Sequence, residues 1–316
     1  MNSLKIFSGN SNLPLATKIT EYLGTRLGQG RITLFPDGEI QVKVDEDVRG
    51  GDVFVIQSTC SPVNHHLMEL LIFIDCLRRA SAARITAVLP YFGYARQDRK
   101  DEGRVPITAK LVANLLTTAG VDRVLTLDLH AAQIQGFFDI PVDHLLAEPV
   151  ISYHLKELDL NGSLMLVSPD VGNVKRARAY AQRFNVDLAI IDKRRVSGSD
   201  IVIENIIGNV KDKTVLMVDD LISTGGTICN AANLCMDRGA KAVYVAATHP
   251  VLCGPAVERL ASAPIKSLIV TDTIPLSSRA KEELTGIDVL TVSELLGEAI
   301  RRIHRNESVS SLFITG

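Results

Sequence analysis

The chain has 316 residues, which exceeds the usual size of one hydrophobic core and favours two domains. Its composition, 46% hydrophobic and 22% charged, is typical of a globular protein in water. The net charge of -2 provides no general attraction to nucleic acid, so any anion site must be local.

The sequence also lacks the patterns of membrane proteins and of disulfide-rich proteins. No run of 18 apolar residues occurs, and the first residues lack the long apolar core of a targeting segment. The five cysteines have no CxxC spacing, which favours buried thiols in a reducing compartment over a zinc or disulfide framework. We therefore expect a cytoplasmic protein with no membrane partner.

Short apolar runs alternate with helix-length segments along the chain. In the first half we expect strands at residues 4–7, 32–35, 53–57, 85–90 and 124–128, and helices at 14–23, 64–80 and 107–118. A second cycle begins near residue 147, with strands at 164–168, 187–191, 215–219, 242–248 and 267–271. This alternation predicts mainly parallel sheets flanked by helices, with ligand sites at the carboxyl ends of the strands.

Two segments are similar enough to suggest an internal repeat. Residues 124–131 and 215–221 both read as an apolar strand that ends in acid. We therefore expect two similarly built domains, residues 1–146 and 147–316, each near the usual domain size.

The first polar motif is the turn Phe35-Pro36-Asp37-Gly38-Glu39. Pro-Asp-Gly is a strong turn signal, so a simple hairpin corner is one interpretation. The flanking acids would also suit amino or hydroxyl donors on a ligand.

A basic segment, residues 90–100, leaves the carboxyl end of a later predicted strand and contains Arg96 and Gln97. Such a run is often a solvated surface, but at a strand end arginine can bind phosphate oxygens with its planar fork of donors. His130 follows another strand end. It is either a hydrogen-bonded structural residue or an unusual member of a magnesium shell.

Two further strand ends carry charge. Asp170 precedes a predicted helix, where an acid either complements the helix dipole or coordinates a metal that bridges phosphates. Lys193 and Arg195 precede residues 196–200, a polar segment that we expect to be mobile without ligand. A cationic loop of this kind can close over a polyphosphate and stabilise charge in the transition state.

The strongest signal is residues 215–227, VLMVDDLISTGGT, in which a buried-strand pattern runs into acids, hydroxyls and glycines. We expect Thr227 to cap the helix at residues 228–237, whose N-terminus would bind an anion such as phosphate. Because successive strand side chains point to opposite faces, Asp219 and Asp220 should not serve one ligand atom. The alternative is a tolerant surface loop.

Together these motifs resemble those of the ribose-phosphate pyrophosphokinases, also called phosphoribosyl pyrophosphate synthetases. The resemblance covers essentially the whole chain and rests on FPDGE at 35–39, PYFGYARQDRK at 90–100, LDLHA at 127–131, SPDVG at 168–172, DKRR at 192–195 and VDDLISTGGT at 218–227. It implies two phosphoribosyltransferase-like domains. It also implies transfer of the diphosphoryl group of ATP to the 1-hydroxyl of ribose 5-phosphate, with release of AMP, for nucleotide biosynthesis.

The resemblance further implies roles for individual residues. Ribose 5-phosphate would be held by Asp219, Asp220, Ser223, Thr224, Gly225, Gly226 and Thr227. ATP would be held by Phe35, Asp37, Gly38, Glu39, Arg96 and Gln97, with the 35–39 turn contributed by a neighbouring subunit. Magnesium (Mg2+) would lie at His130 and Asp170, and Lys193 and Arg195 would be catalytic.

The C-terminal residues 308–313 resemble the family tail. The resemblance implies a regulatory anion site for phosphate and ADP, between subunits of a homohexamer, at Arg49, Ser81, Ser308, Ser310 and Phe313. The last residues, about 15 in number, would pack back on the first domain.

Three positions depart from the family pattern. Ser223 stands where aspartate is common, Asn173 stands where glycine is common, and the segment after Arg195 lacks the usual proline. Asp47 also introduces an acid beside the regulatory site. Two other functions stay open: a phosphoribosyltransferase, which would share residues 218–227, and a non-catalytic regulatory subunit of a synthetase.

Overall fold

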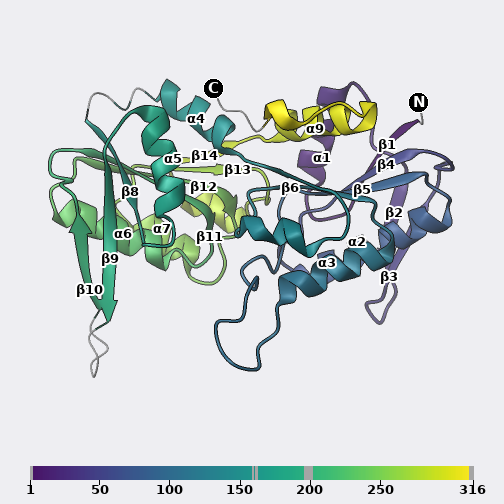
Figure 1. Ribbon diagram of the computed structural model, residues 1–316, viewed down its shortest axis with the longest axis horizontal. Helices are drawn as coiled ribbons and strands as arrows, with labels where there is room; N and C mark the ends of the chain where they lie inside the picture. The colour runs from purple at the N-terminus through teal and green to yellow at the C-terminus, as the bar shows by residue number, and fades with distance from the viewer. Residues whose placement is uncertain (1–2, 159, 161–162, 196–201, 313–316) are drawn as a thin grey trace. The chain divides into compact units, whose positions relative to one another are not determined.

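The computed structural model describes residues 3–158, 160, 163–195 and 202–312, and only the backbone of residues 193–195 and 202–204 (Figure 1). The chain forms two compact units. The first comprises Met1–Ala147, Thr273–Pro275 and the chain from Thr291 onward, and the second comprises Glu148–Asp272 and Leu276–Leu290.

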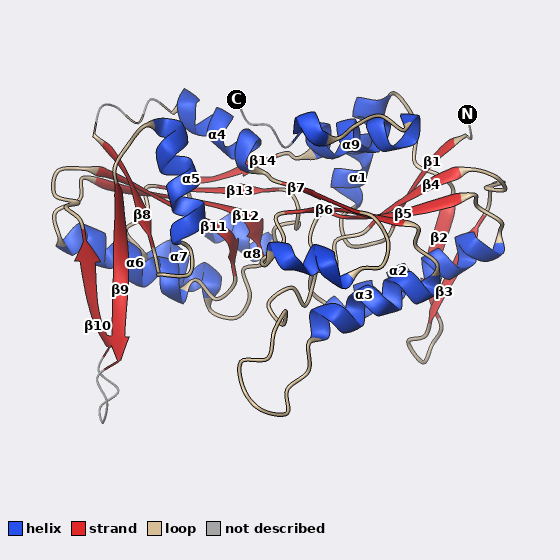
Figure 2. Cartoon of the chain, in the orientation of Figure 1, coloured by secondary structure: helices blue, strands red, loops and turns tan. Residues whose placement is uncertain are grey.

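The first unit is built on a five-stranded parallel sheet with the strand order β1-β4-β5-β6-β7. Its strands are β1 (Leu4–Ser8), β4 (Asp52–Ile56), β5 (Arg84–Leu89), β6 (Arg123–Leu127) and β7 (Val142–Leu145). Its helices are α1 (Leu13–Leu23), α2 (Val63–Arg79), α3 (Thr108–Ala119) and α9 (Ser293–Arg305), with the 3-10 helices η1 (Ala132–Phe137) and η2 (Ser310–Leu312). Helices α1 and α9 cover one face of the sheet, and α2 and α3 cover the other (Figure 2).

Helix α1 carries its start and stop signals in the sequence. The Asn12 side chain accepts a hydrogen bond from the Leu15 N–H, and Pro14 occupies the first turn, where a missing N–H costs nothing. Gly24 ends the helix in the left-handed conformation, φ 65°, and donates to the Glu21 carbonyl. The apolar face between these ends buries Leu15 and Ile19.

The predicted strand at residues 32–35 does not belong to the parallel sheet. It falls in β2 (Gly30–Leu34), which pairs only with β3 (Ile40–Val44) as a separate antiparallel hairpin. The Pro-Asp-Gly turn connects these two strands, so the hairpin-corner interpretation of that motif is correct. The hairpin packs against α2 through β3.

The second unit contains a seven-stranded sheet with the order β10-β9-β8-β11-β12-β13-β14, parallel except for β10. Its strands are β8 (Leu164–Ser168), β9 (Leu188–Arg195), β10 (Val202–Ile207), β11 (Thr214–Ile222), β12 (Ala242–Pro250), β13 (Ser267–Thr271) and β14 (Ile287–Leu290). Its helices are α4 (Glu148–Glu157), α5 (Val174–Phe184), α6 (Gly226–Asp237), α7 (Ala256–Ser262) and α8 (Ser278–Glu283).

The order of this sheet reverses between β8 and β11. From β8 the chain continues to β9 and β10 on one side, then returns to place β11 on the other side. In parallel sheets, ligands bind beyond the carboxyl ends of the strands at such a reversal. The loops after β8 and β11, which contain the SPDVG and VDDLISTGGT motifs, therefore lie at the favoured position. No helix within the described part of the chain is long and apolar enough to cross a membrane.

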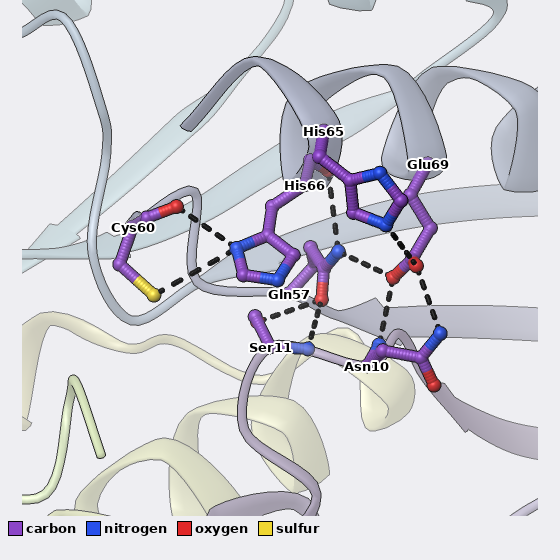
Figure 3. Close-up of polar contacts among 7 residues, drawn as sticks. All are labelled: Asn10, Ser11, Gln57, Cys60, His65, His66 and Glu69. Atoms are coloured by element: carbon purple, nitrogen blue, oxygen red, sulfur yellow. Dashed lines mark hydrogen bonds and ion pairs between the residues drawn. The ribbon is translucent and has the colours of Figure 1, made fainter. Parts of the chain in front are cut away.

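In the first unit, a buried polar cluster holds the chain that leaves β1 (Figure 3). Glu69 of α2, 0% exposed, accepts hydrogen bonds from the Asn10 N–H at 2.7 Å, from Asn10 Nδ2 at 2.9 Å and from Gln57 Nε2 at 2.7 Å. Gln57 in turn accepts from the backbone and hydroxyl of Ser11. Three donors therefore compensate the loss of solvent around one buried carboxylate.

We predict that Glu69→Ala lowers the free energy of unfolding by about 3 kcal/mol, because it leaves buried donors on Asn10 and Gln57 without their acceptor. The exposed Glu21 of α1 provides the control: Glu21→Ala should change the free energy by less than about 0.5 kcal/mol. Denaturant unfolding of the three proteins measures both values. Equal effects of the two substitutions would show that the hydrogen bonds to Glu69 add nothing to the free energy of unfolding.

Candidate functional site

Two acids lie near the carboxyl end of β11. The strand continues three residues beyond the predicted end and finishes at Ile222, so Asp219 and Asp220 are strand residues. Asp220 is 6% exposed, and its backbone N–H donates to Asp219 Oδ1 at 2.8 Å. The two acids therefore interact directly, and whether they serve one ligand atom stays a prediction.

Burial of Asp219, reinforced by the hydrogen bond and repulsion from Asp220, raises the pKa of Asp219 to about 8. The Asp220 N–H and the positive charge of Arg176 on α5 act in the opposite direction. At neutral pH the Asp219 carboxyl is consequently mostly protonated. A ligand hydroxyl or a cation that replaces this proton would meet two closely spaced oxygen acceptors.

The loop after β11 leads directly into α6, which begins at Gly226 rather than at residue 228. Gly225, not Thr227, is the N-cap, with φ 75° in the left-handed region where a side chain would be strained. No side chain caps this helix end. The first N–H groups of α6 therefore face outward with the positive end of the helix dipole, which is the arrangement that binds phosphate.

Neighbouring segments fix the backbone of this loop. The Cys253 N–H donates to the Ser223 carbonyl at 3.0 Å, and the Ser223 hydroxyl lies 3.3 Å from the Cys253 sulfur. Arg259 of α7 donates to the Thr224 carbonyl at 3.1 Å. These contacts satisfy the carbonyl groups of Ser223 and Thr224 and place a guanidinium beside the loop.

The loop between β8 and α5 approaches the same end of β11. Asp170 Oδ1 accepts from the Asn173 N–H at 2.9 Å, and the Ser168 hydroxyl donates to the Asp170 carbonyl. The Asn173 side chain donates to the carbonyl of Val218, which directly precedes the acid pair. The structure thus brings the predicted metal residue Asp170 and the predicted sugar residues Asp219 and Asp220 to adjoining loops of one unit.

Lys193 and Arg195 belong to strand β9, whereas the sequence predicted that they follow the strand. The predicted strand end at Ile191 is wrong, because β9 continues to Arg195 and pairs antiparallel with β10, with Lys193 opposite Glu204. The β9–β10 hairpin extends beyond the helices of its own unit (Figure 1). Residues 196–200, the expected mobile segment, lie outside the described residues.

In the first unit, the loops after β5 and β6 meet at the carboxyl edge of the sheet. Gly93 enables the first of them, since a Cβ atom there would lie 2.4 Å from the Thr59 carbonyl oxygen. Arg96 and Gln97 are exposed just beyond it, and His130 is exposed after β6. Gln133 donates to Asp98 at 2.7 Å and so links the two loops. These three predicted residues therefore share one edge.

The other predicted ATP residues lie on the separate β2–β3 hairpin. Its turn is closed by hydrogen bonds from Phe35 N–H to the Glu39 carbonyl and from Glu39 N–H to Asp37 Oδ1. Gly38 has φ 93°, which suits glycine. The Phe35 ring is 46% exposed, so this tip offers an apolar surface to another molecule.

The residues of the predicted regulatory site form two pairs within the first unit. Arg49 Nη1 donates to the Ser81 hydroxyl at 3.2 Å, and the Ser310 N–H donates to the Ser308 hydroxyl at 3.1 Å. Asp47 Oδ1 accepts the Arg49 N–H, which places the extra acid directly beside the guanidinium residue. Phe313 lies outside the described residues.

Across the described chain, no group of three or more His, Cys, Asp or Glu side chains is arranged to hold a metal. Magnesium does not require such a cage, because it keeps several waters and binds through one or two carboxylates together with substrate phosphates. Asp170 offers oxygen ligands of this type, at a loop that a hydrogen bond from Asn173 joins to the end of β11. The imidazole of His130 is a less usual ligand for this ion.

Sequence reasoning missed Arg259 as a residue of the site. It did not identify Arg176 as a neighbour of the acid pair either. Both are helical arginines whose partners lie in distant parts of the second unit. In the sequence, each arginine is recognisable only as a cation in a helix after a strand that carries a motif. This pattern does not show which residue the arginine contacts, because the contact with the β11 region depends on the tertiary fold.

The raised pKa of Asp219 makes a prediction about stability. Above about pH 4 this carboxyl ionises in the unfolded chain but stays protonated when folded, so its contribution to stability is lost as the pH rises towards 8. The gain in the free energy of unfolding that Asp219→Asn gives over the wild type should therefore be larger at pH 8 than at pH 5, by roughly 4 kcal/mol. Denaturant unfolding at both pH values measures this difference. Asp237 is exposed, so Asp237→Asn should change the free energy of unfolding equally at the two pH values. An equal change at both pH values for Asp219→Asn would contradict the raised pKa of Asp219.

Comparisons with known proteins agree with this arrangement. The family model for the N-terminal domain of ribose phosphate pyrophosphokinase matches residues 4–120, and the phosphoribosyl synthetase-associated domain matches residues 200–314. Ribose-phosphate pyrophosphokinases from Rhodopirellula baltica and Campylobacter jejuni are 58% and 54% identical to this chain, covering 99% of it and 99% and 100% of their own lengths.

The crystal structure of phosphoribosylpyrophosphate synthetase from Mycobacterium smegmatis has a TM-score of 0.92 to this chain at 44% identity. The match covers 96% of this chain and all of that one. The predicted fold class, with parallel sheets flanked by helices in two phosphoribosyltransferase-like parts, is confirmed. This chain belongs to the ribose-phosphate pyrophosphokinase family.

Proposed function

We propose that this protein transfers the diphosphoryl group of ATP to the 1-hydroxyl of ribose 5-phosphate, giving 5-phosphoribosyl 1-pyrophosphate and AMP. The observation that carries the proposal is the end of β11, where a buried acid pair is followed within a few residues by an uncapped helix N-terminus. A sugar phosphate carries both matching groups, hydroxyl donors and an anion.

The acceptor is held by the second unit. The phosphate of ribose 5-phosphate lies on the loop Ser223–Thr227, where the N–H groups of α6 donate to its oxygens. The ribose hydroxyls donate to Asp219 and Asp220, displacing the proton that this pair holds in the free protein. Ser223 leaves the rim of the loop without the carboxylate common in the family, and its hydroxyl accepts or donates there instead.

ATP is held by Arg96 and Gln97, together with the 35–39 turn of a neighbouring subunit. The exposed ring of Phe35 at the hairpin tip supports this arrangement, because an aromatic face suits a stacked purine. A shared site of this kind requires an oligomer, and we propose the homohexamer of the family.

Asp170 and His130 would hold magnesium, which when bound neutralises charge on the phosphates of ATP. Lys193 and Arg195 contribute fixed positive charge as negative charge grows on the transferred group and on departing AMP. Catalysis of this kind depends on positioning and electrostatics, and it requires no covalent nucleophile.

The two domains divide these tasks. Residues 1–146 supply the Arg96 and His130 loops, and residues 147–316 supply the acceptor loop and the catalytic loop. The C-terminal residues pack on the first domain, in accord with the contact of α9 with α1. We place the protein in the cytoplasm, where ATP and ribose 5-phosphate are available, and propose regulation by phosphate and ADP at Arg49, Ser81, Ser308, Ser310 and Phe313.

The nucleotide product tests this function. With ATP, magnesium and ribose 5-phosphate the protein should form AMP, and it should form none when ribose 5-phosphate is left out. Chromatographic separation of AMP from ADP measures the outcome. Formation of ADP alone would identify an ordinary kinase, and no nucleotide turnover would favour a phosphoribosyltransferase or a non-catalytic subunit.

Lys193→Ala tests the catalytic loop. Loss of a cation that stabilises the transition state should lower kcat by at least about 100-fold while the protein remains folded. Lys241→Ala is the matched control, because Lys241 is exposed and precedes β12, at the end of the sheet opposite the site. If Lys193→Ala turned over at the rate of Lys241→Ala, Lys193 would have no part in the mechanism.

A further inference from the structure

At the reversal of the second sheet, β8 and β11 separate before β11 ends. Their pairing covers only Thr214–Leu216 of β11 against Leu164–Leu166 of β8, whereas β11 stays paired with β12 as far as Ile222. Backbone groups two residues apart on a strand face the same neighbour, so the Val218 carbonyl faces the side that β8 has left. Val218 is 1% exposed, and a buried carbonyl needs another donor.

The side chain of Asn173 supplies that donor. Its Nδ2 atom donates to the Val218 carbonyl across the gap, while its backbone N–H donates to Asp170 Oδ1 at 2.9 Å. Asn173 occupies the N-cap of α5, yet its side chain makes no capping hydrogen bond there. Asparagine at an N-cap usually accepts a hydrogen bond from the helix, but the Asn173 side chain instead connects two loops.

We propose that Asn173 is a positioning residue for the diphosphoryl transfer. It fixes the Asp170 loop, which would hold the metal and the phosphates of ATP, against the end of β11, which would hold the acceptor. This inference rests on the proposed function. The position commonly holds glycine in the family, and glycine lacks the side chain needed for this bridge.

The bridge should act on kcat rather than on the binding of ribose 5-phosphate. The phosphate loop has its own supports, the N–H groups of Leu252 and Cys253 and the guanidinium of Arg259, and none of them involves Asn173. Loss of the bridge leaves the phosphate loop in place, but it widens the range of distances between the Asp170 loop and the acceptor. Small misplacements of reacting groups lower the rate of the chemical step much more than they weaken binding.

Two substitutions separate this role from capping of α5. Asn173→Ala removes both the bridge and any capping capacity. Asn173→Asp keeps the shape and is a good N-cap at the positive end of the helix dipole, but its carboxylate cannot donate to the Val218 carbonyl. If Asn173 only capped the helix, the kcat of Asn173→Asp would equal or exceed that of the wild type. If Asn173 forms the bridge, the kcat of Asn173→Asp is at least as low as that of Asn173→Ala.

We expect kcat for AMP formation to fall about tenfold or more in both variants, with KM for ribose 5-phosphate within about twofold of the wild type. Both variants should remain folded at the assay temperature, although loss of the donor to the buried Val218 carbonyl lowers their melting temperature somewhat. Asn209→Ala is the control: Asn209 accepts one hydrogen bond, from the Lys211 N–H, in the turn that precedes β11, and its loss should leave kcat unchanged.

The results separate the two levels of the proposal. A wild-type protein that forms no AMP would overturn the proposed function and this inference with it. An active wild type whose kcat is matched by Asn173→Asp would overturn the positioning role alone. The same holds if the variants raise only KM, or if kcat falls only because they unfold at the assay temperature.

Discussion

The burial of Asp219 and Asp220 against each other is the constraint on which the site depends. Two carboxyl groups in contact inside a sheet cannot both be charged, and the raised pKa of Asp219 expresses that conflict. Two features of the second unit act against the raised pKa: the hydrogen bond from the Asp220 N–H and the positive charge of Arg176. Under the proposed function, the hydroxyls of the ribose would donate hydrogen bonds to these two carboxyl groups.

The first unit also contains a buried carboxylate, but hydrogen-bond donors surround this one. Glu69 receives three N–H donors from Asn10 and Gln57, so it is fully satisfied by the protein and fixes the chain after β1. Asp219 is left to interact mainly with another acid. The two carboxyl groups therefore differ: donors of the protein satisfy Glu69, whereas burial beside Asp220, where β8 and β11 have diverged, raises the pKa of Asp219.

The sequence predicted the strands and the motif-bearing loops well, because these depend on local hydrophobic patterns. The strands at residues 164–168 and 267–271 were predicted to the residue. Tertiary contacts produced the errors: Gly225 rather than Thr227 caps α6 because only glycine fits the left-handed turn, and β2 pairs with β3 rather than joining the parallel sheet. The contacts of Asn173 and Arg259 join loops that are 45 and 35 residues apart, and no local pattern specifies them.

The central claim is that the acceptor bound at the end of β11 attacks the β-phosphorus of ATP, so that the outer two phosphates move as one group. ATP labelled in its β-phosphate tests this most directly, with the label followed into the products after a single turnover. The account predicts that all of the transferred label appears in the sugar product and that the released AMP carries none. Label retained in a nucleotide diphosphate, with only the γ-phosphate on the sugar, would contradict it.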